Sequence, residues 1–268
     1  MKTLDDRVVV LTGAAGGIGS ALARALDARG ARLALVDRRA DGLRSVAEGC
    51  RHASVHVADL SDLNGLEGLV REVVDAHGHI DAAIHNAGLT VHGPFAALEV
   101  ADIDRVLDVD LRAVAHLTHH LLPELRARGE AHLVFVSSMA GFSAFPYQAV
   151  YSAAKFGLRG LGDALHIELG GDGIGVTTVM PGTIATGFMS DNPSYDPTTS
   201  ARLGQLMQRY GTSPDRVARV TVRAMLRNRR AVRVGWDSHL SAALLWLCPP
   251  LLPAVLRALH RSRALGPS

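Results

Sequence analysis

The sequence predicts an α/β protein with a doubly wound, mostly parallel sheet of seven strands and helices on both faces. Short apolar, β-branched runs alternate along the chain with longer segments of helical periodicity, as in sheets of buried parallel strands joined by helices. A glycine-rich turn separates the first apolar run from the first helical segment. The 268 residues, 48% of them hydrophobic, can bury the core of one large domain.

The strands and helices are placed by apolar runs and by periodicity. The strands are expected at residues 7–11, 32–36, 54–57, 80–84, 132–136, 176–179 and 231–234. The clearest helical segments are residues 18–28, 63–76, 102–128, 151–169 and 214–227. Pro214 suits a first helical turn after a Ser213 cap. Ligands of such sheets bind at the carboxyl ends of the strands, so functional residues are expected in the loops there.

The loop after the first strand reads LTGAAGGIG over residues 11–19. Glycines between a strand and a helix let the backbone approach a pyrophosphate, and the helix N-terminus supplies N–H donors. The spacing of Gly13, Gly17 and Gly19, with no Gly-Lys-Ser/Thr after it, argues against a nucleotide triphosphatase. A turn of this kind can be purely structural. Asp37 favours a ligand, because it ends the next strand, where an acid receives the hydroxyls of an adenosine ribose.

The segment VYSAAKFG, residues 150–157, places Tyr151 and Lys155 four positions apart. On a helix these side chains lie one above the other and can share one site. A nearby cation favours a phenolate and lowers a pKa that is normally about 10, which makes tyrosine a usable acid or base. The pair taken alone is also compatible with a half-buried tyrosine beside a solvated lysine.

These motifs together resemble the single-domain type of the short-chain dehydrogenase/reductase family, over roughly residues 5–235. The ordered set is Thr12-Gly13 to Gly19, Asp59-Leu60, Asn86-Ala87-Gly88, Ser138, Tyr151 with Lys155, and Pro181-Gly182 followed by Thr183. The resemblance implies a Rossmann-like fold and an NAD(P)-dependent oxidoreductase. The order of the motifs is what makes it specific.

The resemblance implies a catalytic role for three side chains. Ser138 would bond the substrate oxygen, and Tyr151 would exchange a proton with that oxygen as hydride passes to or from the nicotinamide. Lys155 would bind the nicotinamide ribose and, with the positive charge of the oxidised ring, lower the pKa of Tyr151. Ser137 points to the opposite face of its strand and is expected to be structural.

The resemblance also implies which residues bind the cofactor. Asp59 contacts adenine, Asn86 and Gly88 wall the cleft, and Thr183 meets the nicotinamide carboxamide. The full set is Gly13, Gly17, Ile18, Gly19, Asp37, Arg38, Asp59, Leu60, Asn86, Ala87, Gly88, Tyr151, Lys155, Pro181, Gly182, Thr183 and Thr186.

The sequence departs from the family pattern at Asp110, where members usually carry an asparagine that helps hold a water near the catalytic lysine. An ionised carboxylate only accepts hydrogen bonds, whereas an amide also donates them. A carboxylate facing the site should raise the pKa of Lys155 and partly offset that lysine's influence on Tyr151. The alternative is that Asp110 is turned aside. In either case activity is expected, and Asp110 is counted with the catalytic residues.

The cofactor is expected to be NAD, with NADP as the alternative. Asp37 would repel a 2′-phosphate, and Gly16 stands before Gly17, where NADP-preferring members often carry a basic residue. Arg38 and Arg39 keep NADP open, because an arginine beside the acid can bind a phosphate.

The substrate is expected to be a hydrophobic secondary alcohol or its ketone. Apolar candidates for its pocket are Val91, Met139, Phe142, Tyr147, Phe188, Met189 and Met207, several of them in a substrate loop over about residues 186–212. Some of these side chains could instead only pack that loop. A second hypothesis is a catalytically silent NAD(H)-binding scaffold or redox sensor, against which the intact Ser138, Tyr151 and Lys155 count.

Charge is divided unevenly along the chain. Residues 1–200 carry 24 acidic and 16 basic side chains, whereas residues 201–268 carry 2 and 12. Five arginines at helical spacing, Arg216, Arg219, Arg223, Arg227 and Arg230, suit a solvated helix face, and the alternative is contact with an anionic partner. Nucleic acid is not expected, because aromatic residues are few and no reader motif is present.

The sequence divides into a catalytic domain, residues 1–238, and an apolar and basic extension, residues 239–268. Residues 240–256 are uncharged but broken by three prolines, and they predict two short helices rather than a membrane span. The helices are expected either to cover an interface in a homodimer or homotetramer or to lie on a membrane surface, with Arg257, Arg261 and Arg263 beside lipid headgroups.

The cysteine count and the N-terminus indicate a reducing, intracellular setting. Cys50 and Cys248 offer neither a disulfide framework nor metal-ligand spacing, so no metal is expected. The first residues, MKTLDDRVVVLTG, lack a long apolar stretch with a cleavage site. A cytoplasmic protein, with membrane association as an open addition, is the expectation.

Overall fold

A computed structural model describes residues 1–189 and 191–261 and confirms the predicted fold class. Its seven-stranded sheet is parallel throughout, in the order β3-β2-β1-β4-β5-β6-β7. The strands are β1 Val8–Thr12, β2 Arg32–Asp37, β3 Ala53–Val57, β4 Ala82–His85, β5 Ala131–Val136, β6 Ile174–Pro181 and β7 Ala231–Val234. The strand order reverses between β1 and β4, and a crevice for ligands forms at such a switch point.

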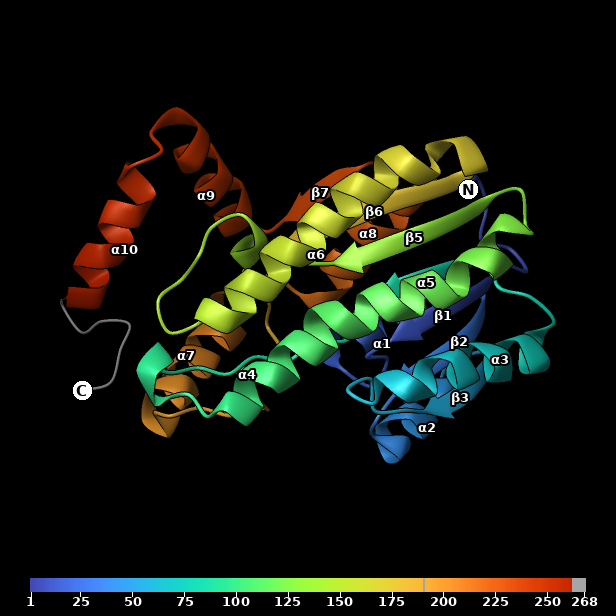
Figure 1. The fold of residues 1–268 in the computed structure, drawn as a ribbon, viewed down its shortest axis with the longest axis horizontal. Helices are drawn as coiled ribbons and strands as arrows, with labels where there is room; N and C mark the ends of the chain where they lie inside the picture. The colour runs from blue at the N-terminus through green and yellow to red at the C-terminus, as the bar shows by residue number, and fades with distance from the viewer. Residues whose placement is uncertain (190, 262–268) are drawn as a thin grey trace.

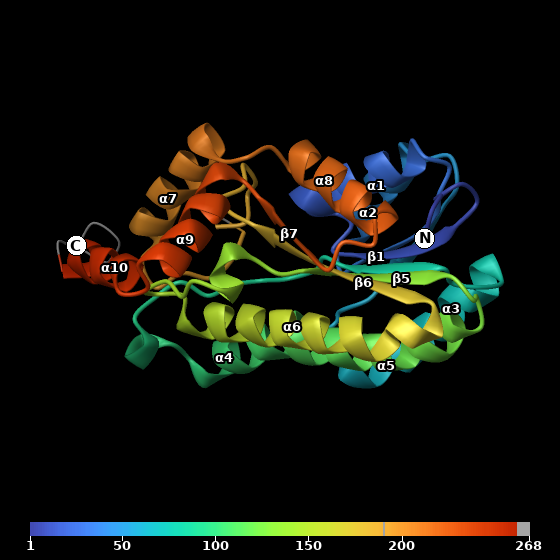
Figure 2. The same ribbon diagram turned by 90° about the horizontal axis from the view of Figure 1, so that it is seen from above.

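Helices cover both faces of the sheet (Figures 1 and 2). Their bounds are α1 Gly17–Asp27, α2 Ala40–Glu48, α3 Leu66–His77, α4 Val100–Leu107, α5 Ala113–Arg126, α6 Ala149–Glu168, α7 Pro197–Tyr210, α8 Pro214–Leu226, α9 Trp236–Leu247 and α10 Leu251–Arg261. Figure 2 shows α1, α2 and α8 on one side of the sheet and α3, α4, α5 and α6 on the other. This is the arrangement of a doubly wound fold.

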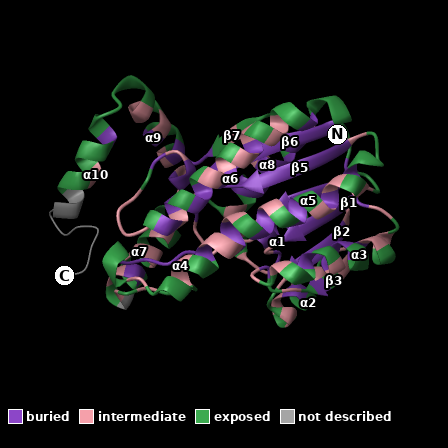
Figure 3. Ribbon diagram, viewed as in Figure 1, coloured by how far each residue is buried: buried purple, intermediate pink, exposed green. Residues whose placement is uncertain are grey.

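The core consists of two apolar layers, one on each face of the sheet. Successive strand residues point to opposite faces, so Val9 and Leu11 of β1 pack in the layer with α1 and α8, whereas Val10 packs in the layer with α3 and α5. Figure 3 shows the central strands buried and most outward helix faces exposed, whereas the edge strands β3 and β7 are partly exposed. The arginines of α8, such as Arg216 and Arg223, lie on its exposed face, as the solvated-face interpretation predicts.

The segment expected as one helix, residues 102–128, is interrupted. α4 and α5 are joined by a π-helical turn at Asp108–Arg112, whose extra residue shifts the register of the helix. Periodicity alone does not reveal this interruption, because each helix keeps an apolar face: Val106 of α4 is buried in a small cluster with Val91, and Leu117 of α5 lies in the layer with α3. The turn contains Asp110 and directs its side chain into the protein interior, where it is 0% exposed.

α9 and α10 extend from one end of the molecule, at the end where α7 also lies (Figures 1 and 2). The domain boundary expected at residue 238 falls inside α9. The first turn of α9 is tied to the sheet, because Ser238 Oγ donates to the Met180 carbonyl (3.0 Å) and Asp237 Oδ2 accepts from the Thr183 N–H (2.6 Å). In the described ranges no single helix has the length and apolar composition of a membrane span, and only α9 and the first eight residues of α10 together, bent by 119°, have both.

Candidate active site

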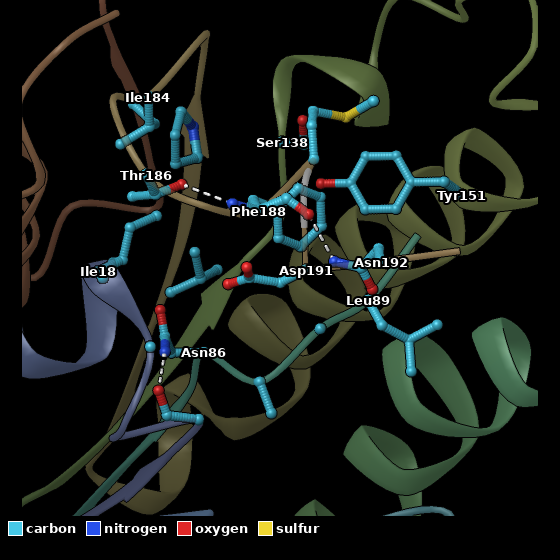
Figure 4. A pocket seen from close by; sticks show the side chains of 18 of the residues that line it. Ile18, Asn86, Leu89, Ser138, Tyr151, Ile184, Thr186, Phe188, Asp191 and Asn192 are labelled. Atoms are coloured by element: carbon cyan, nitrogen blue, oxygen red, sulfur yellow. Dashed lines mark hydrogen bonds between the residues drawn. The ribbon is translucent and has the colours of Figure 1, made fainter. Parts of the chain in front are cut away.

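A cavity of about 830 Å³ opens at the carboxyl ends of the strands (Figure 4). Its walls come from the β1–α1 turn and from the segments that follow β2, β3, β4, β5 and β6, although these segments are far apart in the sequence. All the site residues proposed from the sequence line the cavity except Asp110, which lies directly behind its wall. The loops at the strand ends therefore bring the residues of the separate sequence motifs into one cavity.

The glycine-rich turn is locked against the loop after β4. Thr12 Oγ1 accepts from the backbone N–H groups of Asn86 (3.0 Å) and Ala87 (3.1 Å), and Asn86 Nδ2 donates to the carbonyl oxygens of Thr12 and Gly13. Gly13 has a φ of +65°, and a Cβ there would lie 2.7 Å from Ala87 Cα. Only glycine fits this contact, which leaves the N-terminus of α1 open toward the cavity as an anion site.

The acid at the end of β2 is held by the backbone. Asp37 Oδ2 accepts from the Ala15 N–H (3.1 Å), and Oδ1 accepts from the N–H (3.1 Å) and Nε (3.3 Å) of Arg39. Arg38 also lines this end of the cavity, and so does Arg105, which arrives from α4 and was not predicted. The carboxylate and the guanidinium groups form a site for a ribose or a phosphate at the end of the cavity far from Tyr151.

Asp59, after β3, is fixed by Ser61. Its Oδ1 accepts from the Ser61 N–H (3.0 Å) and the Ser61 hydroxyl (2.7 Å), and these bonds hold the pKa of Asp59 below its usual range. Arg105 and Arg38 lower that pKa further. Asp59 is therefore an ionised acceptor, which suits an exocyclic amino group.

Three side chains converge at the other end of the cavity. Ser138 follows β5 and accepts from the Ala140 N–H through Oγ (3.1 Å). Tyr151 lies on α6 with its hydroxyl pointing toward Ser138 (Figure 4). One turn further along, Lys155 is 3% exposed; its Nζ lies 5.5 Å from the Tyr151 ring centre and donates to the Val136 carbonyl (3.3 Å). The Ser137 hydroxyl instead donates to the Lys155 carbonyl (2.9 Å), in line with the structural role expected for it.

Asp110 faces Lys155 from the π-helical turn. Its Oδ2 lies 3.0 Å from Lys155 Nζ, and its Oδ1 accepts from the Leu89 N–H (2.7 Å). A Cβ on Gly88 would lie 3.1 Å from both the carboxylate and the ammonium, so the pair packs tightly against this glycine. A buried carboxylate and ammonium thus sit behind the wall that carries Tyr151.

The pKa values of this group follow from burial and charge together. Burial, the largest single effect, lowers the pKa of Lys155, but Asp110 and Tyr151 together raise it by more, so the net shift is upward. Burial and the Asp110 charge raise the pKa of Tyr151. Lys155 and a hydrogen bond with Ser138 lower it. Lys155 therefore lowers the pKa of Tyr151 as the sequence predicts, but the net shift of that pKa in this structure is upward. Burial likewise raises the pKa of Asp110.

Apolar side chains line part of the substrate end of the cavity. Met139, Phe188, Met189 and Met207 line it, and the ring of Phe188 lies 5.8 Å from that of Tyr151. The other three apolar candidates lie outside its lining: Val91 is buried with Val106 beneath α4, Phe142 packs under the Arg233 guanidinium, and Tyr147 packs against His92. The preceding loop turns Tyr147 away at a φ of +63°, a conformation that its sequence position does not reveal.

Polar residues at this end were missed by sequence reasoning. Asn192 connects two loops, because its Oδ1 accepts from the Thr90 N–H (3.1 Å) and its Nδ2 donates to the Phe188 carbonyl (2.6 Å). His92 is 4% exposed, and its Nδ1 has no hydrogen-bond partner among the described residues. Neither residue belongs to a motif, so no sequence signal marks them. Over the described part of the chain, no cluster of acidic, histidine and cysteine side chains has metal-binding geometry.

Comparison with known proteins identifies the class to which this fold and site belong. The sequence profile of the family described as short chain dehydrogenase matches residues 7–196. A dehydrogenase/reductase SDR family protein 7-like of Anopheles gambiae is 32% identical over 266 residues, covering 91% of this chain and 82% of the relative. The chain belongs to the short-chain dehydrogenase/reductase family, and it is an NAD(P)-dependent oxidoreductase.

Further relatives agree with this assignment. Ketoacyl reductase HetN of Nostoc sp. is 35% identical over 196 residues, or 71% of this chain and 68% of HetN. The crystal structure of levodione reductase superposes with a TM-score of 0.79 at 29% identity, covering 90% of this chain and 99% of that structure. A structure from Burkholderia phymatum in complex with NAD shares the fold, with a TM-score of 0.81 at 24% identity over 99% of this chain and 96% of that one.

Proposed function

We propose that the protein is an NAD-preferring alcohol dehydrogenase or ketone reductase that acts on a hydrophobic secondary alcohol or its ketone. The observation that carries the proposal is the convergence of Ser138, Tyr151 and Lys155 at the apolar end of one cavity, whose other end holds Asp37. This arrangement sets a proton-transferring group beside a substrate site, in the same cavity as the residues that suit a dinucleotide.

The residues present fit the dinucleotide. The close contact of Gly13 with Ala87 frees the N-terminus of α1 for a pyrophosphate, Asp37 receives the ribose hydroxyls, and Asp59 accepts from adenine. Thr183 would meet the nicotinamide carboxamide, and Thr186, which lies against Gly17, would contact the cofactor near the glycine-rich turn. The bound cofactor supplies the hydride acceptor or donor at its nicotinamide ring.

The side chains of this chain handle the proton. Ser138 Oγ and the Tyr151 hydroxyl point at the same space and together bind the substrate oxygen. Tyr151 takes the proton of the alcohol during oxidation and returns it during reduction. Lys155 stabilises the phenolate by charge, and Asp110 positions Lys155 and keeps it an ammonium.

The NAD preference rests on Asp37. Its carboxylate lines the cavity and would repel a 2′-phosphate, whereas it would bond both hydroxyls of an unphosphorylated ribose. Arg38, Arg39 and Arg105 are the groups through which NADP would compete. Family structures carry either cofactor: the Burkholderia structure is a complex with NAD, and one from Beutenbergia cavernae, 26% identical, holds NADP at low occupancy.

The substrate class rests on the apolar side chains around Tyr151. Methionines at 139, 189 and 207 with Phe188 form an adaptable wall that suits a bulky hydrocarbon group. Levodione reductase and ketoacyl reductase HetN are named for the reduction of carbonyl compounds, which is consistent with a ketone as one of the two substrates.

The test is a screen of secondary alcohols and ketones with NAD(H) and NADP(H), run with wild type and Tyr151→Phe. We expect turnover of apolar substrates and a fall in kcat of about 10²- to 10⁴-fold for the variant. Tyr210→Phe, at a 62% exposed position on α7, is the matched control and should keep its activity. Tight cofactor binding without any Tyr151-dependent turnover would favour the scaffold alternative, and activity confined to small polyols would contradict the substrate class.

The proposal places the enzyme in the cytoplasm as a homodimer or homotetramer. Support for self-association comes from the outer face of α6, where Ile167 is 81% and Phe156 is 44% exposed. Cys50 and Cys248 are both free thiols, which persist in a reducing compartment. Sedimentation velocity of wild type and Ile167→Arg tests the assembly: equal masses would remove α6 as the interface.

A further inference from the structure

The hairpin formed by α9 and the described part of α10, here called the apolar hairpin (residues 236–258), exposes its largest apolar side chains. Trp246 is 83% exposed, Leu247 70%, Trp236 69%, Leu240 49%, Val255 44% and Leu251 43%. Figure 3 shows both helices largely exposed, in contrast to the buried sheet. Six large apolar side chains exposed on two consecutive helices mark an interaction site.

The apolar hairpin is also free of negative charge beyond its first turn. From Ser238 to the end of the chain the sequence has no aspartate or glutamate. Arg257 is exposed on α10 among apolar neighbours. Arg263 lies outside the described residues, and the side chain of Arg261 is likewise not described. Apolar helix faces bordered by arginine, with tryptophans at their ends, are typical of helices that lie in the interface of an anionic membrane.

Helix length decides how the hairpin can meet a bilayer. α9 has 12 residues and α10 has 11, so each is roughly 17 Å long at 1.5 Å per residue. The hydrocarbon layer is about 30 Å thick. The two helices also meet at 119°. Each helix therefore suits a position along the membrane surface.

The apolar hairpin is connected to the substrate end of the cavity. Asp237, in the first turn of α9, accepts from the backbone of Thr183, which lines the cavity. α7 contributes Leu203 and Met207 to the cavity wall and shares the same end of the molecule with α9 and α10 in both views (Figures 1 and 2). The outer face of α7 adds Leu206, 47% exposed, to the apolar surface at this end.

We propose that the apolar hairpin docks the enzyme on an anionic lipid surface and thereby places the substrate end of the cavity beside the bilayer. The reacting alcohol or ketone is then a lipid-soluble molecule taken up from that surface, a statement that rests on the proposed function. A second copy of this chain is the weaker occupant, because a symmetric contact would bring together two arginine-bearing hairpins whose only acid, Asp237, is already bonded to the Thr183 backbone. The exposed face of α6 already offers a separate surface for self-association.

The experiment is co-sedimentation of the full-length protein with phosphatidylcholine vesicles, with and without phosphatidylglycerol. We expect binding to the anionic vesicles, and a loss of about tenfold or more in partitioning for the double variant Trp246→Ser/Leu247→Ser. Arg257→Glu should weaken binding to the anionic vesicles by about fivefold or more and leave the weaker binding to neutral vesicles unchanged. Val57→Ser, at a 57% exposed apolar position on β3, the sheet edge opposite β7, is the matched control and should bind like wild type.

Two results would overturn the inference. The first is wild-type protein that stays in the supernatant with anionic vesicles. The second is a double variant that binds vesicles normally but sediments as a smaller particle without them, since the hairpin would then cover a second copy. NAD(H) binding and circular dichroism verify that each variant is folded. Vesicle binding needs no turnover, so a failure of the proposed function and a failure of membrane docking are seen separately.

Discussion

The catalytic cavity and the apolar hairpin break the usual rule of burial in opposite ways. Behind the cavity, Asp110 and Lys155 are charged side chains with exposures of 0% and 3%. On the hairpin, Trp246 is 83% exposed. The two buried charges pair with each other, and the Leu89 N–H donates to the carboxylate. The apolar surface of Trp246, in contrast, is left in contact with solvent. Buried charge is therefore coupled to stability, and the exposed apolar surface is available for a partner.

The largest effect is expected from breaking the buried pair. Asp110→Ala leaves the Lys155 ammonium buried without a counter-charge, and we expect a loss of about 3–5 kcal/mol in the free energy of unfolding, measured with urea. Asp108→Ala is the control from the same π-helical turn; it removes only a surface pair with Arg112 and should cost about 1 kcal/mol or less. Equal losses for the two variants would show that burial of the pair does not matter.

Cofactor selectivity is the next effect in size. Asp37→Ala removes charge-assisted hydrogen bonds to the ribose, each worth about 1.5–3 kcal/mol, so the Kd for NAD should rise about tenfold or more. The Kd for NADP should fall, because the repulsion of its 2′-phosphate is lost. Fluorescence titration with both cofactors measures the change, and Asp41→Ala, on the exposed side of α2, serves as control. Unchanged NAD affinity would remove Asp37 from the ribose site.

The Asp110 charge should also be visible in the pH dependence of turnover. Asp110→Asn removes a negative charge that raises the pKa of Tyr151, while the lowering effect of Lys155 remains. The pKa of Tyr151 then falls, so the rising limb of alcohol oxidation, which reports the phenolate, moves to lower pH. The measurement is kcat against pH with chemistry rate-limiting, and cofactor affinity should change little. Superimposable profiles for wild type and variant would separate Asp110 from the proton path.

The smallest effect is expected on the hairpin. Trp246→Ser leaves few contacts unmade within the chain, so the free energy of unfolding should change by less than about 0.5 kcal/mol. Phe135→Ala, on β5 at 0% exposure, should cost about 3–5 kcal/mol. A large loss in the free energy of unfolding for Trp246→Ser would show that the side chain packs within the folded chain, and the hairpin would then not be a free apolar surface.

The elements that the sequence predicts best are those whose local pattern agrees with their place in the fold. The run at residues 132–136 is buried on both faces, and β5 occupies Ala131–Val136. α2, at Ala40–Glu48, was not predicted; it is nine residues long and buries only Leu43, so its apolar pattern is short and weak against the longer helical segments. The π-helical turn at Asp108–Arg112 was missed for a different reason: an added residue in a helix leaves no marker in composition.

The sequence by itself determined the fold class, the family motifs and the candidate residues at the strand ends, because parallel strands bring their carboxyl ends to one edge. Tertiary structure alone decided the 3.0 Å approach of Asp110 to Lys155, the turning of Tyr147 onto His92, and the arrival of Arg105 from α4. It also decided the sign of the Tyr151 pKa shift. These properties depend on distances and burial between segments far apart in the chain, and a linear pattern records neither.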